Sequence, residues 1–78
     1  MDNTCSLSDI KVGAKAVVER LETHGTMRRR LLDIGLCNGT VVECVGRSPM
    51  GDPKAYLIRG AVIAIRANDG RGVIVRGI

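Results

Sequence analysis

The sequence predicts a mostly β fold, a small barrel of about five strands with one short α-helix. The apolar residues are almost all aliphatic, because the chain has one tyrosine and neither phenylalanine nor tryptophan. β-branched side chains suit the pleated surface of a sheet. Ten glycines and two prolines provide the turns that a small barrel or sandwich of short strands needs. With 78 residues, the chain is expected to form one domain with a thin core.

The expected strands are short runs of apolar and β-branched residues that alternate with turn sequences. They cover residues 14–21, 40–47, 54–59, 61–66 and 73–75. In the second strand, Val42 and Cys44 share one face because successive side chains point to opposite sides. Turns are expected at residues 48–53 and 68–72, which are rich in Gly, Pro, Asn and Asp. Residues 1–6 are predicted to be a flexible N-terminal arm, and residues 7–78 a single domain.

One segment, residues 26–34, has the periodicity of a helix. Met27, Leu31 and Ile34 lie at i, i+4 and i+7 and therefore share a face. Thr26 is a suitable N-cap, and Gly35 lies where a glycine with positive φ ends a helix. Five short strands and one short helix together describe a small SH3-like or similar barrel.

Charge and cysteine content narrow the cellular setting. The net charge of +4 suits an acidic protein partner, an anionic membrane surface or nucleic acid, and equally a solvated surface without a partner. Cys5, Cys37 and Cys44 are an odd number with no close pair, unlike the even cysteine sets of small secreted domains. The sequence shows neither a signal peptide nor an apolar run long enough for a membrane span. We therefore expect a cytoplasmic chain with reduced thiols and no membrane insertion.

The sequence offers little for metal or catalytic chemistry. His24 and the cysteines lack the local pairs of a zinc site. We interpret Cys44 as a small core residue and Cys37 as a turn residue. The aspartates are single acids beside turns, where they commonly bind their own backbone. We therefore predict no catalytic residue, no metal-ligand set and no cofactor, and a chain that is not an enzyme.

The run Arg28-Arg29-Arg30 is the most distinctive surface feature of the expected helix. Three interpretations stay open: a solvated helix face, a docking patch for an acidic protein surface, or a nucleic-acid contact. Arginine is favoured at interfaces. Proteins that bind single-stranded nucleic acid usually add aromatic stacking platforms, and Tyr56 is the only aromatic residue. No nucleic-acid partner is therefore expected.

The tip of the 48–53 loop is a second candidate contact. It consists of Pro49, Met50 and Gly51. An exposed methionine adapts to different partner surfaces, but the same side chain can fold back over the barrel. Both interpretations stay open at the level of sequence.

Four segments together resemble the ferrous-iron transport protein A (FeoA) family. Residues 27–36, Met-Arg-Arg-Arg-Leu-Leu-Asp-Ile-Gly-Leu, resemble its Arg-Leu-x-(Asp/Glu)-Met-Gly-(Leu/Ile) run, and residues 39–42 continue its x-Gly-x-x-Val pattern. Residues 48–53 resemble its Ala-Pro-Leu-Gly-Asp-Pro loop, residues 7–13 its Leu-x-x-Leu-x-x-Gly start, and residues 59–66 its Arg-Gly and closing strand. After residue 66 the family usually has acidic residues, which this chain lacks apart from one aspartate.

The positions that carry the resemblance are expected to build the barrel more than to bind a partner. Glycines allow tight reversals on either side of the helix, and prolines stiffen the loop. These signature positions are Leu31, Leu32, Gly35, Leu36, Gly39, Asp52, Pro53 and Gly60.

The resemblance implies a cytosolic accessory or regulatory protein of bacterial ferrous iron uptake. Its implied partner is the membrane ferrous iron transporter that carries a GTPase-type domain on its cytoplasmic side. Arg28, Arg29 and Arg30 and the 49–51 tip are then the expected contacts. The alternatives are a direct iron-binding carrier, a metal-responsive regulatory module and, with less support, a nucleic-acid-binding small barrel.

Overall fold

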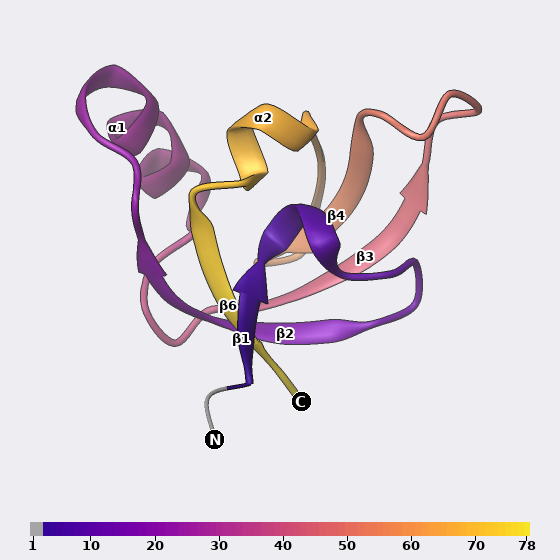
Figure 1. The fold of residues 1–78 in the computed structure, drawn as a ribbon, viewed down its shortest axis with the longest axis horizontal. Coiled ribbons are helices and arrows are strands. Elements are labelled where there is room, and N and C mark those ends of the chain that lie inside the picture. Colours follow the sequence, from indigo (N-terminus) through magenta and orange to yellow (C-terminus); the bar gives the residue numbers. More distant parts are fainter. Residues whose placement is uncertain (1–2) are drawn as a thin grey trace.

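A computed structural model describes residues 3–78 as one strongly curved antiparallel sheet with three short helices (Figure 1). The strands follow the spatial order β1-β6-β2-β3-β4-β5. They are β1 (Thr4–Ser6), β2 (Lys15–Leu21), β3 (Val41–Arg47), β4 (Lys54–Ile58), β5 (Ala61–Ile65) and β6 (Val73–Gly77). The helices are the 3₁₀ turn η1 (Leu7–Asp9), α1 (Gly25–Ile34) and α2 (Ala67–Gly70). The predicted mostly β fold is confirmed, with a sixth strand and two further helical turns.

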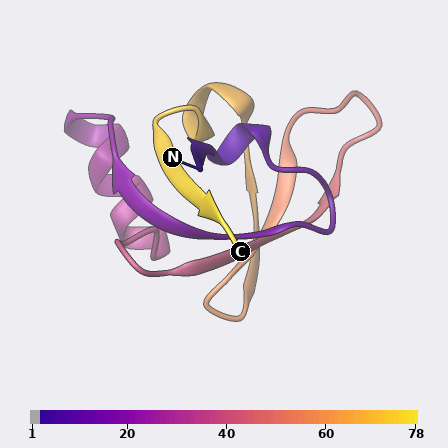
Figure 2. The same ribbon diagram turned by 60° about the horizontal axis from the view of Figure 1, so that its bottom comes forward.

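Two β-bulges give the sheet its curvature. The pairing of β2 with β6 shifts register between Val18 and Arg20. The pairing of β3 with β4 shifts between Cys44 and Gly46. An extra residue on one strand bends that strand and increases its twist. The sheet is therefore strongly curved, as the turned view in Figure 2 shows.

The core follows the alternation that the sequence predicts. Val42 and Cys44 on β3 are fully buried, whereas Val41 and Val45 on the same strand are 49% and 41% exposed. The predicted faces of this strand are therefore confirmed. The buried apolar residues are Leu7, Ile10, Ala16, Val18, Leu31, Leu36, Val42, Cys44, Tyr56, Ile58, Ile65, Val73 and Val75.

Polar contacts hold η1 against the barrel. Leu7 is fully buried, and its carbonyl oxygen accepts a hydrogen bond of 3.2 Å from Tyr56 Oη. Lys54 Nζ donates to the carbonyl oxygens of Ser8, at 2.8 Å, and Ile10, at 3.0 Å. Since both donors lie on β4, the start of the chain is attached to a strand more than forty residues away.

The expected flexible arm is instead, in part, a strand. Thr4–Ser6 pair with β6, with Thr4 opposite Arg76 and Ser6 opposite Ile74. Residues 1–2 of that predicted arm lie outside the described residues. A three-residue, mostly polar segment shows no alternation, and its strand conformation depends on the hydrogen-bonding edge of β6. The sequence pattern alone therefore did not reveal it.

The start of α1 differs slightly from the prediction. The helix begins at Gly25 with His24 as N-cap, so Thr26 does not cap it. The His24 side chain makes no capping hydrogen bond. Gly25 has a φ of 66°, a conformation that turns the chain into the helix without a side-chain cap.

The end of α1 is as predicted. Gly35 has a φ of 112°. Its amide donates to the carbonyl oxygen of Leu32 at 3.0 Å, and the amide of Leu36 donates to that of Leu31 at 3.1 Å. These two bonds form a Schellman motif. Leu31 and Leu36 are both buried, so the motif brings two leucines into the core.

The expected turn at 68–72 contains a short helix. In α2, the amide of Ala67 donates to Asp52 Oδ1 at 2.8 Å, and Ser8 Oγ donates to the Ala67 carbonyl oxygen at 2.7 Å. Asp52 was expected to bind backbone near its own turn. It instead caps a helix that lies fifteen residues further along the chain.

Candidate interaction surface

Helix α1 lies at one side of the barrel (Figure 1), and it carries the three arginines. Leu31, which follows them, is 2% exposed and packs in the core. Arg28, Arg29 and Arg30 are all exposed. The apolar face of the helix therefore fixes its orientation, and the arginines project from the remaining surface.

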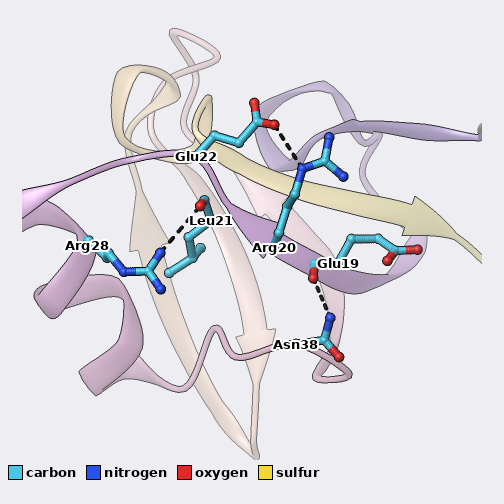
Figure 3. A network of polar contacts seen from close by, with 6 residues as sticks. All are labelled: Glu19, Arg20, Leu21, Glu22, Arg28 and Asn38. Carbon is cyan, nitrogen blue, oxygen red and sulfur yellow. Dashed lines mark hydrogen bonds and ion pairs between the residues drawn. The ribbon is translucent and has the colours of Figure 1, made fainter.

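The three arginines differ in the hydrogen bonds and ion pairs that they make. Arg28 Nη1 donates to the carbonyl oxygen of Leu21, at the end of β2, across 3.4 Å (Figure 3). Within residues 3–78, neither Arg29 nor Arg30 makes a hydrogen bond or ion pair. Arg28 is thus directed toward β2, whereas the guanidinium groups of Arg29 and Arg30 are available to a partner.

The acidic residues of β2 and the turn after it are engaged with other arginines. Glu22 pairs with Arg20 at 2.8 Å, and Glu19 pairs with Arg76 at 3.1 Å. The carbonyl oxygen of Glu19 also accepts a hydrogen bond from Asn38 Nδ2 (Figure 3). Exposed ion pairs of this kind add at most about 1 kcal/mol to stability. Because Glu19 and Glu22 are paired with these other arginines, their carboxylates do not neutralise the arginines of α1.

An apolar side chain lies among these charges. Leu32 is 37% exposed, and it follows Arg28 and Arg29 by four and three residues, the spacings of neighbours on a helix surface. Asp33 on the same helix is also exposed, but three arginines against one aspartate leave this part of α1 with a net positive charge. We call Arg28, Arg29, Arg30 and Leu32 the arginine surface.

The loop between β3 and β4 also projects from the barrel. Met50 is 90% exposed, so its side chain does not fold back over the core. Ser48 holds the base of the loop, because its Oγ donates to the Asp52 carbonyl oxygen and its own carbonyl oxygen accepts from the Gly51 amide, both at 2.8 Å. Pro49 is exposed beside Met50.

The two contacts expected from the sequence form separate surfaces. Figures 1 and 2 place α1 and the β3–β4 loop on opposite sides of the molecule, with α2 and η1 between them. The molecule measures 31 × 29 × 22 Å along its principal axes. A partner that touches both surfaces must therefore reach around one end of the barrel.

The three cysteine thiols lie in different environments. Cys44 is fully buried, as expected of a small core residue, whereas Cys37 is half-buried and Cys5 is exposed on β1. Among residues 3–78, no three or more His, Cys, Asp or Glu side chains come together to hold a metal ion. In the same part of the chain, no helix has the length and apolar character to span a bilayer.

Sequence reasoning missed a groove on the outer face of the sheet. It has a volume of about 240 Å³ and lies across β2, β3 and β4. The outward-facing Val41 and Leu57 were the available signal, since they alternate with core residues. The lining residues are Lys15, Val41, Val42, Glu43, Leu57, Arg59 and Gly60.

Most of the signature positions lie where the chain changes direction or enters the core. Leu31 and Leu36 are buried, and Gly35, Gly39 and Gly60 all have positive φ. The remaining three are Leu32 on the arginine surface, Asp52 at the cap of α2, and Pro53, whose carbonyl oxygen accepts from the Ser48 amide.

Comparison with known proteins decides the family. A profile of the FeoA domain matches residues 5–77. The chain belongs to the FeoA domain family. The resemblance seen in the sequence is thereby confirmed. The FeoA domain is a small, non-catalytic accessory domain, which confirms that the chain is not an enzyme.

Relatives of this FeoA-family chain link the fold to iron transport. An Fe(2+) transport protein A/Fe(2+) transporter FeoB fusion protein of Porphyromonas gingivalis is 33% identical over 63 residues, which are 81% of this chain and 8% of that protein. The chain thus spans only a small part of this relative. The solution structure of FeoA from Chlorobium tepidum is 32% identical, with a TM-score of 0.86 over 94% of this chain and 70% of that one.

A third relative confirms the fold class. FeoA from Stenotrophomonas maltophilia, solved in complex with zinc and described as a prokaryotic SH3 domain protein, is 27% identical. Its TM-score is 0.80 over 90% of this chain and 87% of that one. The SH3-like barrel predicted from the sequence is therefore confirmed.

Proposed function

We propose that this chain is a cytosolic accessory protein of bacterial ferrous iron uptake that binds the cytoplasmic domain of an FeoB-type transporter. The supporting observation is the Porphyromonas gingivalis relative, in which an FeoA-like part and FeoB belong to one polypeptide. Linking two modules replaces a binding equilibrium by a high effective concentration. A chain that is separate from its partner has to provide the same proximity through its own binding surface.

The arginine surface is the main contact in this proposal. Arg29 and Arg30 are exposed and form no ion pair within residues 3–78, so binding does not first have to break one. Arginine forms bidentate hydrogen bonds with carboxylates and is enriched at interfaces. Leu32 adds an apolar centre to the charged rim. The complementary partner surface is acidic with an apolar middle.

The tip of the β3–β4 loop is a second and separate contact. Met50 combines 90% exposure with a flexible, polarisable side chain that adapts to a partner surface. Because the loop lies opposite α1 (Figure 1), the partner domain has to provide two regions of contact.

Calorimetric titration of the chain with the isolated cytoplasmic domain of the FeoB transporter from the same organism tests the proposal. The titration is run with and without guanine nucleotide. The double variant Arg29→Glu/Arg30→Glu is expected to lower the affinity by about tenfold or more, because it places like charges against an acidic surface. Lys11→Glu/Arg71→Glu is the charge-matched control, since both residues are exposed and lie outside α1. No heat of binding in any nucleotide state, or an equal loss in the control, contradicts the proposal.

The position of Tyr56 bears on the nucleic-acid alternative. The only aromatic residue of the chain is 1% exposed. It is therefore not available as a platform for stacked bases, which provide about 1–3 kcal/mol each in proteins that bind single strands. Observed binding to single-stranded RNA that weakens steeply with salt would favour this alternative.

A further inference from the structure

Strand β5 is an edge of the sheet whose outer backbone groups have no partner. It ends the strand order and pairs with β4. The hairpin that joins the two strands has the two-residue loop 59–60, so the flanking pair Ile58–Ala61 is hydrogen-bonded and the pattern alternates from there. The backbone amides and carbonyls of Val62 and Ala64 therefore point away from β4. Within residues 3–78, no other segment forms hydrogen bonds with them.

This edge lacks the features that protect most edge strands from further pairing. Natural edges carry lysine or proline, a bulge, or very few residues. The five residues of β5, Ala-Val-Ile-Ala-Ile, include no charge and no proline, and their register with β4 runs without a shift. Val62 on its outer face is 64% exposed. The opposite edge, β1, differs because it has only three residues.

The unpartnered amides limit how two copies of β5 can pair. In an antiparallel pair, the hydrogen-bonded positions have to be Val62 and Ala64 on both strands. Among the registers that satisfy this condition, one includes all of β5. It places Val62 of each copy opposite Ala64 of the other, and Ile63 opposite Ile63 on a two-fold axis. Every outward amide and carbonyl of Val62 and Ala64 then has a partner.

The side chains of β5 fit one another in this register. On the outer face, the bulky Val62 lies opposite the small Ala64. On the inner face, Ala61 lies opposite Ile65, so a small residue again meets a large one. The two copies of Ile63 form a non-hydrogen-bonded pair, in which side chains approach most closely. Apolar cross-strand pairs of this kind stabilise a sheet, so the sequence of β5 is complementary to itself.

The charged residues beside β5 do not oppose this pairing. Arg66 lies opposite Gly60 of the second copy, which has no side chain. Arg59 lies beyond the paired residues, and its side chain lies across Gly35 at the end of its own α1. Like charges directly opposite each other destabilise a strand pair, and this register places no two charges in that relation.

We propose that two copies of this chain associate through their β5 edges into one continuous antiparallel sheet, with the two-fold axis at Ile63. The contact is isologous, since the same surface of each copy takes part. One short strand pair buries less area than a standard stable interface, so we expect a weak dimer with a dissociation constant of about 0.1–1 mM. The edge is distinct from the arginine surface, so this proposal goes beyond the proposed function and does not depend on the transporter.

The first test needs no variant. Amide spectra, amide exchange and translational diffusion of the ¹⁵N-labelled chain are followed by NMR from about 0.05 to 2 mM, a range that brackets the expected dissociation constant. With rising concentration, the Val62 and Ala64 amides should shift and gain protection while diffusion slows. In a mixture of ¹³C-labelled and unlabelled chains, contacts between copies should join Ile63 with Ile63 and Val62 with Ala64. Spectra and diffusion that do not change with concentration, or shifts confined to α1, overturn the proposal.

A pair of variants then isolates the edge amide. Val62→Pro removes an amide that bonds to no other strand, and proline is tolerated at such an edge. Val62→Thr keeps the amide and the β-branched shape. We expect the proline variant to associate at least about tenfold more weakly than the threonine variant, because each copy loses a hydrogen bond. Both variants should retain the amide spectrum of the fold at about 0.05 mM, where the wild-type chain is mainly monomeric.

Two outcomes of these experiments contradict a second copy as the occupant of the edge. Equal association of the proline and threonine variants would show that the Val62 amide takes no part. Protection of Val62 and Ala64 that appears only after addition of the transporter's cytoplasmic domain would assign the edge to that partner instead. Either result overturns the proposal and leaves the arginine surface as a separate question.

Discussion

The side chain of Arg59 lies across Gly35, so closely that a Cβ added to Gly35 would come within 2.8 Å of Arg59 Cδ. The two residues belong to different turns, one between β4 and β5 and one at the end of α1. Gly35 has a φ of 112° and Arg59 a φ of 50°. The arginine also brings positive charge to the C-terminal end of α1, where the helix dipole favours a cation.

Gly35→Ala is expected to destabilise the protein for two reasons. An alanine in the left-handed region costs about 1–2 kcal/mol. The new methyl group also forces Arg59 from its position, which adds about 0.5–1.5 kcal/mol if its side chain leaves a preferred rotamer. Urea unfolding of the variant measures the total loss of free energy.

Gly39→Ala is the matched control for that measurement. Gly39 has a φ of 90°, but an added Cβ there meets no atom within 4 Å. It should therefore show only the backbone cost. Arg59→Ala in the Gly35→Ala background should recover the difference between the two glycine variants. If both variants lower the free energy of unfolding by the same amount, the contact between Arg59 and the new methyl group at residue 35 does not affect stability.

Alkaline pH is expected to weaken the fold through Tyr56. Burial of its hydroxyl, with smaller contributions from Cys44, Asp52 and Asp9, raises the pKa of Tyr56 from 10.0 to about 12. Above pH 10 the unfolded chain releases this proton while the folded chain retains it. Stability is thus fully present below pH 10 and falls by about 2–3 kcal/mol as pH rises to 12. Urea unfolding at a series of pH values measures this slope.

Tyr56→Phe should change that profile in a specific way. At neutral pH the variant loses the hydrogen bond to the Leu7 carbonyl oxygen, at a cost of about 1 kcal/mol. Between pH 10 and 12 its stability should decline less than that of the wild-type chain, since the buried titrating group is gone. Parallel pH profiles for the two proteins would exclude Tyr56 as the cause.

Asp52→Ala should release the start of α2. The carboxylate accepts the Ala67 amide, and loss of a helix cap costs about 1 kcal/mol. Hydrogen exchange at the Ala67 amide should accelerate more than global unfolding explains. Asp52→Asn, which keeps an accepting oxygen, should lose less stability. Asp33→Asn on α1, which makes no hydrogen bond or ion pair within residues 3–78, should stay within about 0.5 kcal/mol of wild type.

Met50→Ala separates folding from binding. With the side chain 90% exposed, truncation should change the free energy of unfolding by less than about 0.5 kcal/mol. Affinity for the transporter domain should fall about fivefold, the loss for a moderate interface residue. Unchanged affinity would remove the loop from the proposed contact and leave the arginine surface by itself.

Local signals in the sequence were sufficient for the end of α1 and for the faces of β3, although not for the N-cap of α1. Gly35 ends the helix as its position predicts, and the alternation around Val42 and Cys44 matches their burial. In both cases the relevant interaction lies within one or two turns of chain. Hydrophobic periodicity and turn residues predict such interactions well, because both depend on residues that are close together in the sequence.

Features that depend on distant partners were not predicted from the pattern. Thr4–Ser6 form a strand only because β6 lies beside them, and α2 is capped by Asp52 from another loop. The attachment of η1 by Lys54 is similarly remote. At the candidate site, the sequence suggested the three arginines and Met50 as possible contacts but did not indicate their separation, since spacing along the chain does not encode which side of a barrel a loop occupies.

The pairing of Thr4 with Arg76 places the two ends of the barrel side by side, away from α1 and the β3–β4 loop (Figure 1). A linker leaving from either strand therefore starts from the same place. In a fused polypeptide such as the Porphyromonas gingivalis relative, a neighbouring domain can be joined at this point while the arginine surface and Met50 stay uncovered. Tandem arrangements of the barrel are thus architecturally compatible with binding through its other faces.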